Sequence, residues 1–590
     1  MAQAVRPALR AADAAAGRGR GLRARPLRQI VRPRGDRDGA GLHLFRRRQF
    51  RARDGKSRRL PAAARCLGAV PAVPADRRDC AGADRGVSGA VSQRDVARGA
   101  GLAALARLGA LIEVVAQPAY TWLFGIATYG IYTVLWAVVN IVENIIDLSM
   151  TQALQRIVPT EREEDAHAAV RFALLVSVLP AALLALAATI FAEPIAALFS
   201  AAPRDRAQLP TAIAIFAWAL PLWTFVEVAT SAARARRAFG PEIRLRIFWE
   251  QVARLIFAVG FFAAGVQSLG LLLAHLASLF LTAILAARLL GRYYDPRLLL
   301  AAPASPRLRR ELLKTGFALL PSAISRRLFN DLPAVLLNLS FPGARGATAA
   351  GLFGIARKVS TVPLIVRQAF QYVLAPLSAA QAAHDRAGVA AIYGFAMRLS
   401  IAFVVPLSAL LMLTASDILS AFAPEAAAAL PLLVILVLGR AAEAVVGPAT
   451  PVVEMTGHRI LPLVNSAIGL GAWALLGAWL VPTHGATGMA WAVSAGTVLI
   501  AWAATLELRI ADGLVAFDRP AIVTLVTALA ASAALWAIGL VLTPAPVRAV
   551  GLLLLFFPAL WLTLRLGLPA GDRQALGKTA RRLRLISVPA

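Results

Sequence analysis

Five basic residues lie inside two long apolar stretches of the sequence, 316–341 and 349–376, and these stretches contain a single acid, Asp331. Insertion scales put an arginine or lysine at the middle of a membrane helix at about 2.5 to 3.5 kcal/mol, so five facing lipid would cost on the order of 10 kcal/mol or more. We therefore expect them to face a water-filled cavity or a bound anion inside a helix bundle. They are Arg326, Arg327, Arg357, Lys358 and Arg367.

Two less specific arrangements are compatible with the same residues. Arg327 and Asp331 lie four positions apart, which is ion-pair spacing on a helix. Arg326 and Arg327 can also extend along the helix to the membrane surface, and Arg357 and Lys358 can lie at a helix end near the lipid headgroups. In that second case the charges would say nothing about a ligand.

The composition is that of an integral membrane protein, because 58% of the 590 residues are hydrophobic and only 16% are charged. The formal net charge of +30 is uneven, with an arginine-rich excess in residues 1–100. That segment has no apolar run or periodicity, so we predict it to be disordered or a mis-assigned start of the gene. It has no folded nucleic-acid module, and we predict no nucleic-acid partner.

From residue 101 onward, the sequence divides into apolar runs of the length that crosses a bilayer as a helix. We predict an all-α polytopic membrane protein with about fourteen transmembrane helices. Their expected limits are 102–125, 131–154, 169–191, 211–232, 247–266, 269–290, 316–341, 349–376, 390–414, 429–450, 460–481, 485–506, 520–542 and 547–568.

Basic residues in the short connections predict the orientation of the chain. The connections 233–246 and 291–315 and the tail 569–590 are rich in arginine, whereas the connections 127–130 and 482–485 contain no charged residue. Because basic loops stay in the cytoplasm, we expect both termini to be cytoplasmic.

Weak internal similarities recur at an offset of about 220 residues and divide the chain into two halves. We predict a disordered segment 1–100, six-helix bundles over 101–312 and 313–513, and two additional helices with a basic tail over 514–590. Two repeats of six helices share one orientation, so their pseudo-two-fold axis would run along the membrane normal. The site would then lie between the bundles, where 316–341 and 349–376 begin the second one.

Several diffuse motifs resemble the Wzx-type oligosaccharide flippases of the polysaccharide transport family, in the MATE-like (MOP) superfamily. They are Tyr129-Gly130-Ile131-Tyr132, Arg237-Ala238-Phe239-Gly240, the stretch 247–254, Gly351-Leu352-Phe353-Gly354-Ile355-Ala356-Arg357-Lys358 and Gly485-Ala486-Thr487-Gly488-Met489-Ala490. The resemblance covers about 101–513.

This resemblance implies a V-shaped cavity between the bundles, and alternating access that moves an undecaprenyl-pyrophosphate-linked oligosaccharide across the bacterial inner membrane. Its partners would be that lipid-linked oligosaccharide, membrane lipids and other polysaccharide assembly proteins. The five cations named above would contact the pyrophosphate, and Arg254 is a further candidate. Because Arg254 follows Glu250 by four residues, an ion pair within one helix is an equal alternative.

Uphill transport needs an energy source, and the sequence contains no nucleotide-binding loop, cofactor motif or metal-ligand spacing. Four acids in or near the apolar stretches are candidates for coupling to a proton or sodium gradient: Glu143, Asp147, Glu227 and Asp331. Each can instead pair with a nearby arginine, as Glu443 can with Arg440.

Two other functions remain open from the sequence. A MATE-like exporter of another lipid or of a small molecule would use the same architecture, although efflux of cationic drugs would require a more acidic cavity. A membrane-bound polysaccharide polymerase or ligase would need a large external loop, and each predicted external connection is short. We therefore predict a transporter rather than an enzyme.

Overall fold

A computed structural model describes residues 109–236, 243–301, 303–365, 386–455, 460–542 and 545–586, all within one unit, Ser88–Ala590. Within these ranges, the regular secondary structure is entirely helical, as predicted. The predicted disordered segment 1–100 and Arg367 lie outside the described residues.

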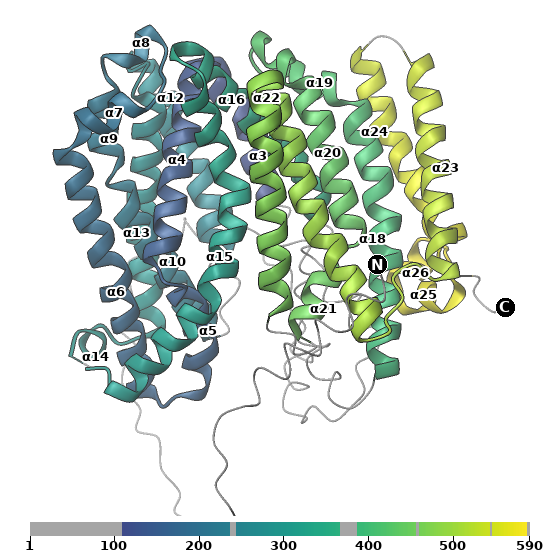
Figure 1. The fold of residues 1–590 in the computed structure, drawn as a ribbon, viewed down its shortest axis with the longest axis horizontal. Helices are drawn as coiled ribbons and strands as arrows, with labels where there is room; N and C mark the ends of the chain where they lie inside the picture. The colour runs from purple at the N-terminus through teal and green to yellow at the C-terminus, as the bar shows by residue number, and fades with distance from the viewer. Residues whose placement is uncertain are drawn as a thin grey trace, which may run out of the picture. The chain divides into compact units, whose positions relative to one another are not determined.

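The helices follow one another through short connections (Figure 1). The α-helices are α3 (Gly109–Phe124), α4 (Ile126–Ile146), α5 (Met150–Ile157), α6 (Glu163–Ile190), α7 (Ala192–Leu198), α8 (Pro203–Arg206), α9 (Leu209–Phe216), α10 (Ala219–Ala235), α12 (Glu250–Ala263), α13 (Gly270–Tyr293), α14 (Pro296–Ala301), α15 (Pro306–Ser340), α16 (Gly343–Ser360), α18 (Arg386–Leu413), α19 (Ala415–Ser420), α20 (Leu430–Val445), α21 (Ala449–Met455), α22 (Leu461–Ala511), α23 (Arg519–Val541), α24 (Ala545–Leu562), α25 (Ala570–Ala575) and α26 (Lys578–Arg582). Short 3₁₀ turns lie at η3 (Val158–Thr160) and η5 (Pro424–Ala429), and π-helical turns at η4 (Ile243–Trp249) and η6 (Thr563–Gly567).

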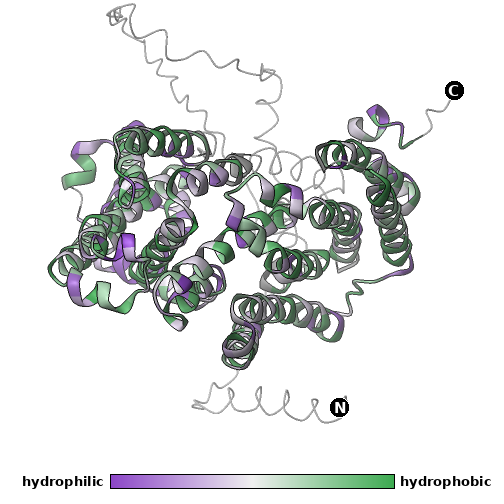
Figure 2. Ribbon diagram, turned by 90° about the horizontal axis from the view of Figure 1, so that it is seen from above, coloured by the Kyte–Doolittle hydropathy of each residue, from purple (hydrophilic) through white to green (hydrophobic). Residues whose placement is uncertain are grey.

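Nine helices of the described part are long and apolar enough to cross a membrane. Viewed along the helices, most of the ribbon is hydrophobic (Figure 2). Many large apolar side chains face outward, among them Leu475, Trp479 and Val526, which are 75%, 70% and 59% exposed. A soluble protein rarely exposes so much contiguous apolar surface, so the protein is a multi-pass membrane protein.

The predicted stretches all overlap helices, although several helix ends differ from the prediction. The helix predicted at 316–341 begins nearly three turns earlier, since α15 starts at Pro306 after a Ser305 N-cap. The stretch 131–154 is interrupted by Leu148 and Ser149, which both have positive φ angles. The stretches 460–481 and 485–506 are two helices within α22, as predicted, and they fold back on each other at Gly485, where the φ angle is 59°. Asn465 Nδ2 donates to Glu507 Oε2 across this pair at 2.7 Å.

Helices α4 and α16 pack backbone against backbone. A Cβ atom built on Gly130 would lie 1.8 Å from the carbonyl oxygen of Ala347, and one on Gly351 would lie 2.6 Å from that of Ile126. Only glycine permits this approach. The crossing joins the first predicted bundle to the second, and it fixes the side chains that α4 and α16 carry on either side of it.

Candidate functional site

Asp331 of α15 lies between two arginines from different helices. Its Oδ2 is 3.7 Å from Nη1 of Arg327, one turn earlier on α15, and its Oδ1 is 3.7 Å from Nη1 of Arg357 on α16. The Asp331 side chain is 6% exposed, whereas those of Arg327 and Arg357 are 32% and 17% exposed. The predicted pairing of Arg327 with Asp331 is therefore confirmed, and α16 adds a second cation to the same carboxylate.

Lys358 extends this group. It is half-buried, and its charge acts on both Asp331 and His275 of α13. Helices α15 and α16 pack on each other and both pack on α4. We call Arg327, Asp331, Arg357 and Lys358 the Asp331 cluster: three cations around one carboxylate on helices of the bundle interior.

The other two predicted cations are not placed in the cluster. Arg326 is exposed, as a residue that faces a water-filled cavity or the membrane surface would be. Successive residues of a helix point about 100° apart, which sends Arg326 to a different face of α15 from Arg327. Arg367 lies outside the described residues. A contact of either residue with a ligand stays a prediction.

Arg254 forms the ion pair that its spacing predicted. Its Nη2 contacts Glu250 Oε1 on the same helix, α12, and both side chains are 3% exposed. Its Nη1 donates to the Tyr132 hydroxyl of α4 at 3.3 Å. This pair ties α12 to α4 inside the bundle, so the structure gives Arg254 a position in the packing, while its role as a ligand stays a prediction.

Two of the acids considered for ion coupling are Asp147, directly after α4, and Glu227, in the middle of α10. Glu227 accepts hydrogen bonds from Arg246 Nη2 at 2.7 Å and Nη1 at 3.1 Å. Asp147 accepts from the hydroxyls of Thr151 and Ser177 at 2.9 and 3.2 Å. These partners account for the presence of both acids among apolar helices, and a role in ion coupling stays a prediction.

Glu143 is the acid of this group that is closest to the cluster in electrostatic terms. It is 3% exposed, and the charges of Glu227, Asp147 and Arg327 all act on it. Glu143 therefore lies buried among charges of both signs, and a coupling role for it stays a prediction.

His275 is a residue that the sequence analysis missed. It is completely buried in α13, and neither ring nitrogen has a hydrogen-bond partner among the described residues. Its ring centroid lies 4.2 Å from that of Trp136 and 5.5 Å from that of Tyr132. The sequence could have indicated this residue, because His275 is the lone histidine of the apolar stretch 269–290. No nearby residues are spaced as metal ligands, so it was not selected. In the described part of the chain, no group of residues fits a metal site.

Comparison with protein-family models found one match that covers much of the first part of the chain. Residues 96–380 match the model described as a polysaccharide biosynthesis protein. They include the whole Asp331 cluster. A search of curated protein sequences found no match.

Solved structures with the same fold are transporters. The lipid II flippase MurJ, in an inward closed conformation, has a TM-score of 0.62 and 12% identity, over 78% of this chain and 97% of that one. A multidrug resistance MATE family transporter of the MOP superfamily, in an inward-facing conformation, has a TM-score of 0.54 and 14% identity, over 72% and 95%. A mutant of the Vibrio cholerae MATE transporter VcmN has a TM-score of 0.52 and 17% identity, over 71% and 97%.

These comparisons confirm the resemblance on which the prediction rested. The chain has the fold of the MurJ and MATE structures, and the predicted fold class is correct. The number of membrane spans and the limits of the two bundles stay predictions.

Proposed function

We propose that this transporter flips an undecaprenyl-pyrophosphate-linked oligosaccharide across the bacterial inner membrane by alternating access. The observation that carries the proposal is the Asp331 cluster, in which one buried carboxylate faces three cations on membrane helices. Three cations and one carboxylate give the cluster a net positive charge, and a bound pyrophosphate group would neutralise it.

The geometry of the arginines leaves room for an anion. Both arginine–Asp331 separations are 3.7 Å, which is longer than a charge-assisted hydrogen bond of about 2.7 to 2.9 Å. In addition, Nε of Arg357 is buried and has no hydrogen-bond partner in the described part of the chain. Guanidinium groups suit the bidentate recognition of phosphate oxygens. Arg357 is therefore the residue that we expect to contact the pyrophosphate directly.

Alternating access is supported by contacts that close one end of the transporter, the upper end in Figure 1, where α8 and α19 lie. Trp122 Nε1 of α3 donates to the Ala421 carbonyl at 2.8 Å. Asn338 of α15 donates to the Ser200 carbonyl at 2.7 Å and accepts from its N–H at 3.0 Å. These bonds join segments of the two predicted bundles, and they would break when that end opens.

The closed end would be the periplasmic one. The opposite, lower end carries α14 with Arg297, and the connections next to it are arginine-rich. Basic loops remain cytoplasmic, so both termini would lie in the cytoplasm. Other polysaccharide assembly proteins, which supply and use the glycan, would be the partners at the two faces of the membrane.

The test is a flipping assay with the full chain in liposomes, in which a labelled undecaprenyl-pyrophosphate oligosaccharide becomes accessible to an impermeant probe. Arg357→Gln should lower the rate about tenfold or more, because a hydrogen bond to a charged group contributes about 1.5 to 3 kcal/mol. Arg345→Gln is the matched control, since Arg345 lies on the same helix but is exposed and stacks on Phe341. Equal rates for the two folded variants would remove the cluster from the mechanism. If the wild type did not flip the labelled lipid but exported another lipid or a small molecule, the proposed substrate would be wrong.

A further inference from the structure

A second polar site lies at the closed upper end, away from the Asp331 cluster. It is a cavity of about 440 Å³, within the range of about 300 to 1,000 Å³ that is typical of small-ligand pockets. The junction of α3 with α4 and the short helix α8 line one side. Thr348 of α16 and Glu425 of η5 line the other. The cavity therefore forms between segments of the two predicted bundles.

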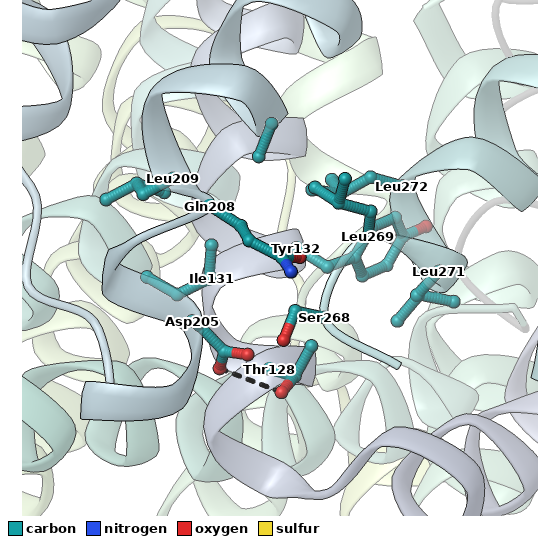
Figure 3. Close-up of a pocket in the computed structure, with 11 residues that line it drawn as sticks. Thr128, Ile131, Tyr132, Asp205, Gln208, Leu209, Ser268, Leu269, Leu271 and Leu272 are labelled. Atoms are coloured by element: carbon teal, nitrogen blue, oxygen red, sulfur yellow. Dashed lines mark hydrogen bonds between the residues drawn. The ribbon is translucent and has the colours of Figure 1, made fainter. Parts of the chain in front are cut away.

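A helix break makes the floor of this cavity. Gly125, with φ of 83°, separates α3 from α4 and leaves the carbonyl of Phe124 without a helical partner. Nη2 of Arg204 donates to that carbonyl and to Thr128 Oγ1, both at 2.9 Å. Thr128 Oγ1 in turn donates to Asp205 Oδ2 at 2.9 Å, a bond that Figure 3 shows from an adjacent small pocket lined by the same two residues. The chain thus holds a guanidinium and a carboxylate rigidly at the cavity wall.

The carboxylate of Asp205 has an unused acceptor. Asp205 is 5% exposed, and its Oδ1 accepts no hydrogen bond from the described residues. Nε of Arg204 lies 3.6 Å from this oxygen, too far for a strong hydrogen bond. Buried polar atoms almost always have a partner. Oδ1 is itself buried, so an O–H or N–H donor of a ligand in the cavity would reach it after a small shift of the cavity wall.

The rest of the lining selects a neutral, hydroxyl-rich ligand over an anion. Two carboxylates, Asp205 and Glu425, outnumber the one guanidinium of Arg204, so the cavity does not attract phosphate. Gln267 and Thr348 add groups that both donate and accept. Trp122 is 59% exposed, and its bond to the Ala421 carbonyl holds the indole in place as a flat apolar wall.

We propose that this cavity binds sugar residues of the transported glycan, with Asp205 accepting from sugar hydroxyls and Trp122 covering an apolar sugar face. The proposal rests on the proposed function, because the glycan is the part of that substrate with this chemistry. Since both predicted bundles line the cavity, opening the upper end would separate its walls and release the sugar.

The experiment uses the full chain in nanodiscs on a printed array of carrier-free oligosaccharides from bacterial surface polysaccharides. Asp205→Asn should lower binding to the best array glycan about tenfold, the loss expected for one hydrogen bond to a charged group. Trp122→Ala should lower it severalfold, because the apolar sugar face loses the indole that covers it. The matched controls are Glu193→Gln and Trp479→Ala, an exposed acid and an exposed tryptophan that do not line the cavity. Circular dichroism and size-exclusion profiles check that each variant is folded.

The array needs no carrier lipid and no flipping, so its outcome is independent of the liposome assay. Unchanged binding in folded Asp205→Asn and Trp122→Ala, or no array binding by the wild type, would overturn the sugar site. Displacement of the glycan by inorganic phosphate would also overturn it, since it would identify an anion site at Arg204. Glycan binding that depends on the cavity, in a protein that does not flip the labelled lipid, would support the cavity and refute the proposed function.

Discussion

Asp331→Asn should destabilise the protein by about 2 to 3 kcal/mol, and an added anion should restore more stability to this variant than to the wild type. At 3.7 Å and an effective dielectric constant of about 20, each arginine gains about 4 to 5 kcal/mol of gross Coulomb energy from Asp331. Desolvation offsets much of that gain, while breaking a buried pair costs about 3 to 5 kcal/mol. Because Arg327 is a third exposed, screening places the expected loss below that range.

The same helix supplies the control. Arg307 and Glu311 of α15 have the same four-residue spacing, at 3.9 Å, but their side chains are 67% and 47% exposed. Glu311→Gln should therefore cost less than about 1 kcal/mol. The assay is thermal unfolding in detergent with and without pyrophosphate, whose binding stabilises the state that holds it.

The decisive result is the difference between Asp331→Asn and Glu311→Gln in how much pyrophosphate raises the melting temperature. Asparagine leaves the cations of Arg327 and Arg357 without a carboxylate, so pyrophosphate should raise the melting temperature of Asp331→Asn more than that of the wild type or Glu311→Gln. Equal destabilisation by both substitutions, or no additional rescue by pyrophosphate in Asp331→Asn, would refute the view that the Asp331 cluster is an anion site awaiting its ligand.

Three further substitutions test the packing around the cluster. Gly130→Ala should lower the melting temperature by several degrees, because its Cβ atom would lie 1.8 Å from a carbonyl oxygen and overpacking costs about 1 to 3 kcal/mol. The control is Gly260→Ala on α12, where no atom lies within 4 Å of the added Cβ. This variant should be neutral or slightly stabilising. Arg254→Leu alone should destabilise by about 3 to 5 kcal/mol, measured by denaturant or thermal unfolding, and adding Glu250→Leu should restore most of the loss, since the penalty is the unpaired buried charge. Asn338→Ala removes two hydrogen bonds at the closed end and should cost about 1 to 3 kcal/mol; faster labelling of a cysteine introduced at that end would show that it opens more often. An unchanged labelling rate would contradict a closing role for Asn338.

Contacts within one helix could be predicted from the sequence, because helical periodicity alone brings the partners together. The pairs Arg327–Asp331 and Arg254–Glu250 were expected from a spacing of four, and both are present. The suggested pairing of Arg440 with Glu443 is present as well, at 2.8 Å. The apolar runs likewise predicted the helices, since a span of that length has few alternatives in a membrane.

Contacts between helices could not be predicted, because they depend on crossing positions that no local pattern encodes. Arg357 reaches Asp331 only because α16 packs against α15 and α4, and the crossing depends on Gly130 and Gly351. The same holds for the faces of α15, where Arg326 is exposed and Arg327 is half-buried. Hydropathy shows that the residue is in a span, but only the packing of the helix shows which face it occupies.

The two proposed sites are rigidly connected, and their separation suits a ligand that is charged at one end and polyhydroxylated at the other. Helix α16 contributes Thr348 to the upper cavity and Arg357 to the Asp331 cluster. At about 1.5 Å per residue, these two positions lie about 13 to 14 Å apart along the helix axis. The crossing of α4 with α16 at Gly130 and Gly351 lies between the two sites and fixes that distance. A pyrophosphate at the cluster would then place the attached sugars toward the upper cavity, so one substrate could contact both sites before the upper end opens.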